Sequence, residues 1–268
     1  MNPLSYDFMQ RALIASVIVG LLAPLIGVFL VQRRLALLGD GMGHVALTGV
    51  GLSFLLGTAA VPTALIVAIA GAVAVELIRT RSKTVGDVAL ALVFYGGIAG
   101  GVLLASLAPG TSSTALNQYL FGSLATVATN DVVVLALVSL ATFALLAVFG
   151  RELFVVSLDP ELAAVQGISV RFISLLLSVL AAVTVVVGMR TVGLLLVAAI
   201  MIVPIAAAQQ LTKSFVATAG VGVFVGVASA VVGLLGSFYL DLPPGPAIVL
   251  VALTIFVLAV ASTLVHKK

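Results

Sequence analysis

Apolar residues run along this chain with few breaks, and charged residues, prolines and glycines divide them into separate stretches. Each stretch approaches the roughly 20 residues that a helix needs to cross the hydrocarbon core of a bilayer. The pattern therefore predicts an all-α integral membrane protein with about nine transmembrane helices. We place them near residues 8 to 32, 36 to 57, 62 to 79, 86 to 107, 131 to 149, 171 to 189, 193 to 211, 216 to 238 and 245 to 265.

A further apolar stretch spans residues 115 to 127. A tenth crossing there would reverse the charge bias of everything that follows, so we interpret it as a short outward-facing or re-entrant helix. The longest weakly hydrophobic connections, 108 to 114 and 151 to 169, are too short for an appended soluble domain. Residues 1 to 268 are therefore expected to form a single transmembrane domain.

The distribution of basic residues predicts the orientation. With the N-terminus outside, ten of the twelve basic residues fall on the cytoplasmic side, and only Arg11 and Arg190 do not. Because Lys and Arg are enriched in cytoplasmic loops, we expect an outside N-terminus and a cytoplasmic C-terminus. The ten are Arg33, Arg34, Arg79, Arg81, Lys83, Arg151, Arg171, Lys213, Lys267 and Lys268.

Composition agrees with a membrane protein and excludes several chemistries. The chain is 63% hydrophobic and only 8% charged, which rules out a soluble globular domain. Its basic residues are scattered in ones and twos, so they form no face for nucleic acid. The chain has no cysteine, which excludes disulfides and thiolate ligands.

Asp40 and His44 are the polar residues that most need an explanation. If the membrane surface lies at Arg34, helical rise places Asp40 about 9 Å deep and His44 about 15 Å deep. Side chains four residues apart share one helix face, so both can reach one cation. Carboxylate and imidazole together suit a divalent metal such as zinc or manganese. The pair therefore predicts a metal or substrate site.

Structural interpretations of the same two residues stay open. His44 alone is compatible with a core histidine, and Asp40 with an interfacial charge paired with Arg33 or Arg34. The flanking glycines at 39, 41 and 43 are expected to permit a locally irregular backbone, whose carbonyls would supplement the two side chains. Glycines four apart at 97 and 101, and at 222 and 226, are expected only to pack helices closely.

A second informative segment runs from about 158 to 168, in a predicted cytoplasmic loop. It opens with a residue suited to an N-cap, followed by proline at the first turn, and glycine stops it. The pattern predicts a short surface helix that either docks against another protein or is an ordinary connection. The residues that define it are Asp159, Pro160, Glu161, Leu162 and Gly167.

Other motifs are absent. No lysine follows the Gly-x-x-x-x-Gly pattern of a P-loop, so any ATP hydrolysis belongs to another subunit. With two histidines, one in the C-terminal tail, the chain offers no Ser-His-Asp arrangement and no two-histidine zinc motif, so we do not expect an enzyme. Glu76 lies one turn before Arg79, and an ion pair explains it.

The residues resemble a known family over nearly the whole chain. The most specific blocks are RRLALLGDGMGHVALTGV from Arg33 and DPELAAVQGI from Asp159. With them the chain resembles the membrane permease subunits of ABC importers for zinc, manganese and iron, the ABC-3 metal permease family of the ZnuB, MntB and TroC-like group. Further blocks lie at 119 to 124, 192 to 204 and 239 to 246.

The resemblance implies roles and partners. Asp40 and His44 would coordinate the transported metal, and the segment from Asp159 to Ile168 would be the coupling helix that meets the ATPase. The family further implies the permease fold of vitamin B12 and metal-chelate ABC importers, a permease homodimer, two ABC ATPase subunits and an extracytoplasmic metal-binding protein. No cofactor would be bound permanently, and ATP would bind the partner subunit.

The resemblance leaves the metal open. Some zinc-type relatives carry a further histidine in the fourth helix, and residues 92 to 97 here contain none. Imidazole suits zinc and carboxylate suits manganese, so one of each does not separate them. We expect ATP-driven import of a divalent metal by alternating access, with zinc slightly favoured over manganese. The alternatives are a stand-alone secondary ion transporter or channel and an ABC importer of a metal chelate.

Overall fold

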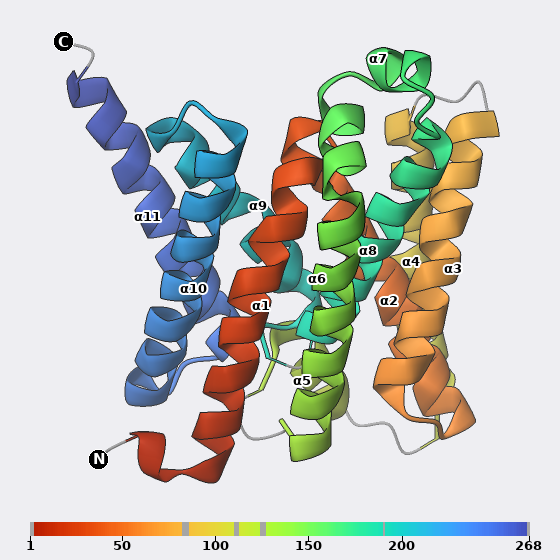
Figure 1. Ribbon diagram of the computed structural model, residues 1–268. Coiled ribbons are helices and arrows are strands. Elements are labelled where there is room, and N and C mark those ends of the chain that lie inside the picture. Colours follow the sequence, from red (N-terminus) through yellow and green to blue (C-terminus); the bar gives the residue numbers. More distant parts are fainter. Residues whose placement is uncertain (1–2, 82–85, 110–112, 124–126, 190, 267–268) are drawn as a thin grey trace.

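Helices follow the apolar runs closely in the computed structural model of this chain (Figure 1). The structure describes residues 1–268 except 1–2, 82–85, 110–112, 124–126, 190 and 267–268. A 3₁₀ turn, η1, spans Pro3–Ser5. The helices are α1 Asp7–Gln32, α2 Ala36–Leu56, α3 Ala60–Arg81, α4 Gly86–Leu107, α5 Ser113–Phe121, α6 Thr129–Leu158, α7 Pro160–Val165, α8 Val170–Gly188, α9 Leu194–Leu211, α10 Phe215–Leu240 and α11 Pro244–His266.

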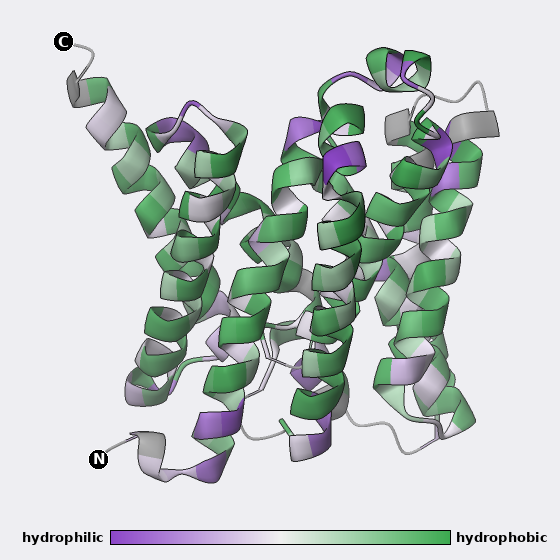
Figure 2. Ribbon diagram, viewed as in Figure 1, coloured by the Kyte–Doolittle hydropathy of each residue, from purple (hydrophilic) through white to green (hydrophobic). Residues whose placement is uncertain are grey.

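The predicted crossings are confirmed as long helices. Within the described residues, seven helices are long and apolar enough to span a membrane, namely α1, α3, α4, α6, α8, α10 and α11. The apolar stretch of α9 is shorter, from Leu196 to Leu211. The remaining long helix, α2, carries Asp40, His44 and five glycines, which lower its hydropathy. Figure 2 shows hydrophobic residues along most of each long helix and hydrophilic residues mostly at the two ends of the bundle.

Two elements differ from the predicted bounds. The helix predicted to end at 149 continues as α6 to Leu158, because Arg151 does not interrupt a helix whereas Asp159 and Pro160 do. The stretch from 115 to 127 contains α5, which ends at Phe121 where Gly122 takes φ +75°. In Figure 1, α5 lies at the end of the bundle opposite α7, and it does not run through to the other end.

The core is centred on α2, which packs most extensively against α4 and also against α3, α8 and α9. Glycines make these approaches possible, because a Cβ on Gly101 of α4 would lie 2.9 Å from the carbonyl carbon of Leu47. A Cβ on Gly226 of α10 would lie 2.5 Å from the carbonyl oxygen of Gly20 on α1. The prediction that these glycines pack helices is confirmed.

Candidate functional site

Asp40 and His44 lie on an unbroken α-helix. The flanking glycines do not make the backbone irregular, and that expectation is wrong, since α2 is helical from Ala36 to Leu56. Two of the glycines allow close packing instead. Gly39 lies beside Met201 and Ala198 of α9, and a Cβ on Gly43 would lie 3.1 Å from the carbonyl oxygen of Leu194.

The two side chains face each other as the helical spacing predicts. Asp40 Oδ1 lies 3.8 Å from His44 Nε2, the His44 side chain is 9% exposed and the Asp40 side chain is 37% exposed. Two ligands of one metal, each about 2.1 Å from it, stand roughly 3.0 to 3.4 Å apart. A closing movement of about half an ångström would therefore let one ion bridge the two atoms.

Among the residues that the structure describes, neither Asp40 nor His44 forms an ion pair or side-chain hydrogen bond with a third residue. The described residues include no salt bridge between Asp40 and either Arg33 or Arg34, so the interpretation of Asp40 as an interfacial ion pair has no support here. His44 Nδ1 is buried and has no hydrogen-bond partner within the described part of the chain. Buried polar atoms are normally hydrogen-bonded. His44 therefore does not fit the interpretation of a core histidine whose ring nitrogens are both hydrogen-bonded.

Helix α4 forms the wall of the site. The ring of Phe94 packs against the His44 imidazole with centroids 4.1 Å apart and planes at 66°. A Cβ on Gly97 would lie 2.6 Å from the carbonyl carbon of His44, and Thr48 Oγ1 donates a hydrogen bond to the Gly97 carbonyl over 2.8 Å. Sequence reasoning assigned none of these α4 residues to the site, because only the fold brings them beside α2.

A cluster of charged side chains lies near the C-terminal ends of α1 and α3 and the N-terminal end of α8. Arg33 Nη1 donates a hydrogen bond to Ser174 Oγ over 2.9 Å. Arg79 Nη2 donates to Glu76 Oε1 over 3.2 Å, which confirms the predicted ion pair. Burial lowers the pKa of the Arg33 guanidinium, the nearby Arg79 lowers it further, and Glu76 partly offsets the change. The charge of Arg33 is therefore influenced by both members of the Glu76–Arg79 pair.

The short helix α7 is built as its sequence predicts. Asp159 Oδ1 accepts hydrogen bonds from the backbone N–H groups of Glu161 (2.9 Å) and Leu162 (3.0 Å), so Asp159 is the N-cap. Pro160 begins the helix, and Gly167, with φ +79°, follows its end. Leu162 is 52% exposed. An apolar side chain therefore projects from the end of the bundle.

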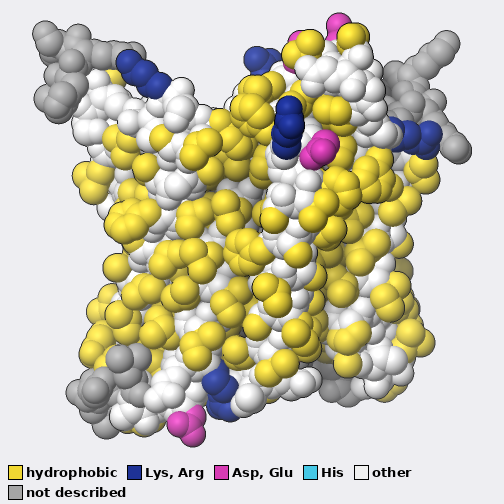
Figure 3. Space-filling view, viewed as in Figure 1, with side chains coloured by type: hydrophobic (Ala, Val, Ile, Leu, Met, Phe, Trp, Pro, Cys, Tyr) yellow, Lys and Arg dark blue, Asp and Glu magenta, His cyan; other side chains and the backbone are white. Residues whose placement is uncertain are grey.

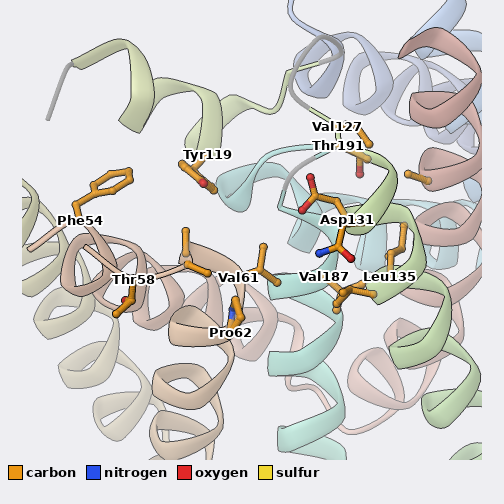
Figure 4. Close-up of a pocket in the computed structure, with 15 residues that line it drawn as sticks. Phe54, Thr58, Val61, Pro62, Tyr119, Val127, Asp131, Leu135, Val187 and Thr191 are labelled. Atoms are coloured by element: carbon orange, nitrogen blue, oxygen red, sulfur yellow. The ribbon is translucent and has the colours of Figure 1, made fainter. Parts of the chain in front are cut away.

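A cavity of about 350 Å³ opens at the end opposite α7, and sequence reasoning did not find it. Figure 4 shows Asp131 and Thr191 on one side and Thr58, Val61 and Pro62 on another. The Asp131 carboxylate is already engaged, since its Oδ2 accepts the backbone N–H of Ala128 over 3.0 Å. Within the described residues no three or more His, Asp or Glu side chains gather around a possible metal position.

Comparison with known proteins decides the family. The profile described as "ABC 3 transport family" matches residues 5–263. The chain belongs to this family. The manganese transport system membrane protein MntC of Listeria innocua is 35% identical over 256 residues, covering 96% of this chain and 91% of the relative. The chelated iron transport system membrane protein YfeD of Yersinia pestis is 31% identical and covers 96% and 86%.

Solved structures agree with this assignment. PsaBC from Streptococcus pneumoniae, determined in complex with a Fab, contains a chain with 31% identity and a TM-score of 0.86, covering 96% of this chain and 92% of its own. An inward-facing metal-chelate type ABC transporter has a TM-score of 0.77 at 16% identity, covering 95% and 86%, and shows the fold alone. The predicted all-α fold of metal-chelate importer permeases is confirmed.

Membership of the ABC 3 family fixes the protein's general role. It is a multi-span permease of a metal-transporting ABC importer in the plasma membrane, it works with other subunits, and it is not an enzyme, because the ATPase is a separate subunit. The relatives are named for manganese and iron, so the preference for zinc that the sequence suggested gains no support from them.

Proposed function

We propose that this permease imports a divalent transition metal by alternating access and that Asp40 and His44 bind the ion within the membrane. The spacing of Asp40 Oδ1 and His44 Nε2, 3.8 Å apart on one face of α2, carries this proposal. An ionisable pair inside a bundle of apolar helices is costly unless it has a function. Without thiolate ligands the site would release its ion readily.

Manganese is the cargo that we propose first, followed by zinc and iron. A carboxylate oxygen and an imidazole nitrogen are acceptable to all three metals, so the ligands alone do not choose among them. The name of the 35% identical Listeria relative favours manganese. The absence of a histidine from residues 92 to 97, where Phe94 faces His44, also removes the ligand that would most favour zinc.

The ion site is proposed to be completed by a second permease. One chain supplies two ligands, too few for tight coordination, and the described residues provide no third acidic or histidine ligand nearby. The Asp40 side chain is 37% exposed, so it remains accessible from outside its own chain. A homodimer with two copies of α2 facing one path would supply four side-chain ligands. Two ATPase subunits and an extracytoplasmic metal-binding protein would complete the importer.

Coupling to ATP hydrolysis is proposed to begin at α7. Its cap is formed by Asp159, and its exposed Leu162 offers an apolar contact for the ATPase. Helix α8 follows after a short connection, so a displacement of α7 moves Ser174 near the start of α8. The hydrogen bond from Arg33 to Ser174 would pass that movement to the junction that precedes α2. The metal site would then open to each side of the membrane in turn.

The uptake experiment uses cells that express the permease with its ATPase and binding protein. Asp40→Ala and His44→Ala are expected to reduce manganese and zinc uptake to background while protein level and thermal stability stay near wild type. Asp7→Ala, which removes an exposed carboxylate at the start of α1, is the control and should transport normally. Normal uptake by both site variants would remove the pair from the mechanism, and uptake without the ATPase would favour a stand-alone carrier.

The coupling experiment measures ATPase activity and metal uptake in the reconstituted importer. Leu162→Ala is expected to leave the complex assembled but to lower the uptake obtained per ATP hydrolysed. Leu242→Ala removes a leucine of similar exposure, 49%, at the opposite end and should keep wild-type coupling. Assembly and coupling that match wild type in Leu162→Ala would contradict the role of α7.

The proposed orientation has the N-terminus outside and α7 in the cytoplasm. Because the chain contains no cysteine, single-cysteine variants report topology directly. Val165→Cys, at a position that is 86% exposed on α7, should react with a membrane-impermeant maleimide only in permeabilised cells. Leu242→Cys should react in intact cells. The reverse pattern would overturn the orientation.

A further inference from the structure

A second groove lies at the α7 end of the molecule, and neither Asp40 nor His44 lines it. It has a volume of about 390 Å³, within the range of about 300 to 1,000 Å³ that is usual for small-molecule sites. In Figure 3 the upper edge of the molecule is hollowed between the part formed by α10 and α11 and the part formed by α1 and α6. Residues of α1, α6, α9 and α10 line the groove.

The mouth of the groove carries a positive charge and hydrogen-bond donors. Lys213 lines it together with Gln32 and Gln209, whose side chains carry amide donors. No carboxylate lines the groove, and no salt bridge to Lys213 occurs among the residues that the structure describes. Ser214 Oγ accepts the backbone N–H of Ala217, which leaves its hydroxyl proton to donate. The mouth therefore suits an anion with several acceptor oxygens.

The floor of the groove is apolar and aromatic. The ring of Phe215 packs against Phe154 of α6 with centroids 4.7 Å apart and against Phe29 of α1 with centroids 5.3 Å apart. Beside the mouth, Leu211 is 53% exposed and Val216 is 80% exposed, as expected for side chains that contact lipid tails. A ligand that fills the groove needs a charged head and an apolar body.

We propose that this groove binds the phosphate of an anionic phospholipid, with Lys213 and the two glutamine amides at the phosphate and the phenylalanine floor beneath the glycerol and acyl chain. The site lies where α9 ends and α10 begins, which is the level of the lipid headgroups. Basic pockets between transmembrane helices at that level are suited to lipid phosphates. The assignment does not depend on the identity of the metal or on the role of Asp40 and His44.

The test measures binding of phosphatidylglycerol and phosphatidylcholine, with matched acyl chains, to the full-length, delipidated permease by native mass spectrometry. Wild type is expected to bind phosphatidylglycerol preferentially. Lys213→Gln should bind it about fivefold more weakly, the factor expected for one lysine near an anionic lipid. Arg151→Gln is the matched control, because Arg151 is an exposed cation near the same end that does not line the groove, and it should bind like wild type.

Further measurements distinguish a lipid phosphate from a free anion as the occupant of the groove. Gln209→Leu keeps the net charge but removes a donor, and it should also weaken phosphatidylglycerol binding. Millimolar inorganic phosphate should not displace the lipid, and full displacement would assign the groove to a free anion. If Lys213→Gln and Arg151→Gln lost phosphatidylglycerol binding equally, or if Lys213→Gln kept it in full, the proposed site would be wrong. Complete loss of lipid on assembly with the ATPase would also overturn the proposal, because the groove would then hold the protein partner.

Discussion

The pairs Asp40–His44 on α2 and Glu76–Arg79 on α3 both join a carboxylate to a basic side chain one turn away, yet their geometry differs. In the α3 pair the atoms lie 3.2 Å apart and the Glu76 side chain is only 4% exposed. In the α2 pair they lie 3.8 Å apart and the carboxylate is 37% exposed. Arg79 and Glu76 are therefore within hydrogen-bond distance of each other, whereas Asp40 and His44 are not.

The difference separates a structural pair from a binding pair. Arginine is always charged and holds a carboxylate through hydrogen bonds, so Glu76 has no need of a metal. His44 Nε2 lies too far from Asp40 Oδ1 for a hydrogen bond, and the lone pair of a neutral imidazole nitrogen suits a metal ion. The same spacing along a helix therefore stabilises α3 but leaves α2 ready for an ion.

Removing the Asp40 charge should produce the largest effect. Asp40→Asn keeps the size of the side chain but loses its charge, so metal uptake should fall more than about a hundredfold. The free energy of unfolding should change by less than about 1 kcal/mol, because within the described residues Asp40 has no ion pair shorter than the 3.8 Å contact with His44. Uptake assays and thermal denaturation of the purified chain measure the two quantities. A stable variant with wild-type uptake would contradict the assignment of Asp40 and His44 as a binding pair.

The second-largest effect, on stability and metal binding, is expected at the contact between α4 and α2. A Cβ on Gly97 would lie 2.6 Å from the His44 carbonyl carbon and 2.8 Å from the Val45 nitrogen, and backbone cannot move aside easily. Gly97→Ala should therefore destabilise the protein by about 1–3 kcal/mol and weaken metal binding. Gly96→Ala adds the same methyl group where nothing lies within 4 Å, and it should be close to neutral. Equal melting temperatures for the two variants would contradict the packing.

Breaking the Glu76–Arg79 pair should lower stability without affecting transport. Glu76→Gln removes the charge that faces Arg79 in a buried position, so the free energy of unfolding should fall by about 1–2 kcal/mol. Metal uptake per folded permease should stay within about twofold of wild type. Thermal denaturation and uptake normalised to protein level check both expectations. A selective loss of uptake would place Glu76 in the pathway and remove the contrast between the pairs.

The smallest effect is expected at the link between α8 and the α1–α2 junction. Ser174→Ala removes the hydroxyl that accepts the Arg33 hydrogen bond, which should cost about 0.5–1.5 kcal/mol. If this link transmits movement from α7, ATPase activity should rise relative to uptake in the reconstituted importer. Ser178→Ala, one turn further along α8, is the control because its hydroxyl donates to the Ser174 carbonyl and, within the described residues, does not contact Arg33. Equal coupling in both variants would show that the link is structural.

Much of the architecture was predictable because a bilayer forces each apolar run into a helix of limited length. The cap of α7 was predictable too, since Asp159, Pro160 and Gly167 act through local backbone chemistry. The end of α6 could not be predicted in this way, because Arg151 ends the apolar run but does not end the helix.

The site was predictable only in part. Helical spacing places Asp40 and His44 on one face without any tertiary information. The contacts of His44 with Phe94 and Gly97 depend on how α4 packs against α2, and nothing local in the sequence encodes that neighbour. The glycines near Asp40 illustrate the same limit, because a residue that permits an irregular backbone also permits close packing within a regular helix.

Direct binding of Mn²⁺ to the purified permease tests the central claim most closely. Electron paramagnetic resonance of free Mn²⁺ would be followed during titration with wild type, Asp40→Asn, His44→Gln and Glu76→Gln. Wild type and Glu76→Gln are expected to deplete the free-ion signal equally, and both α2 variants are expected to lose this binding. Undiminished binding in Asp40→Asn and His44→Gln, or a loss confined to Glu76→Gln, would contradict the central claim.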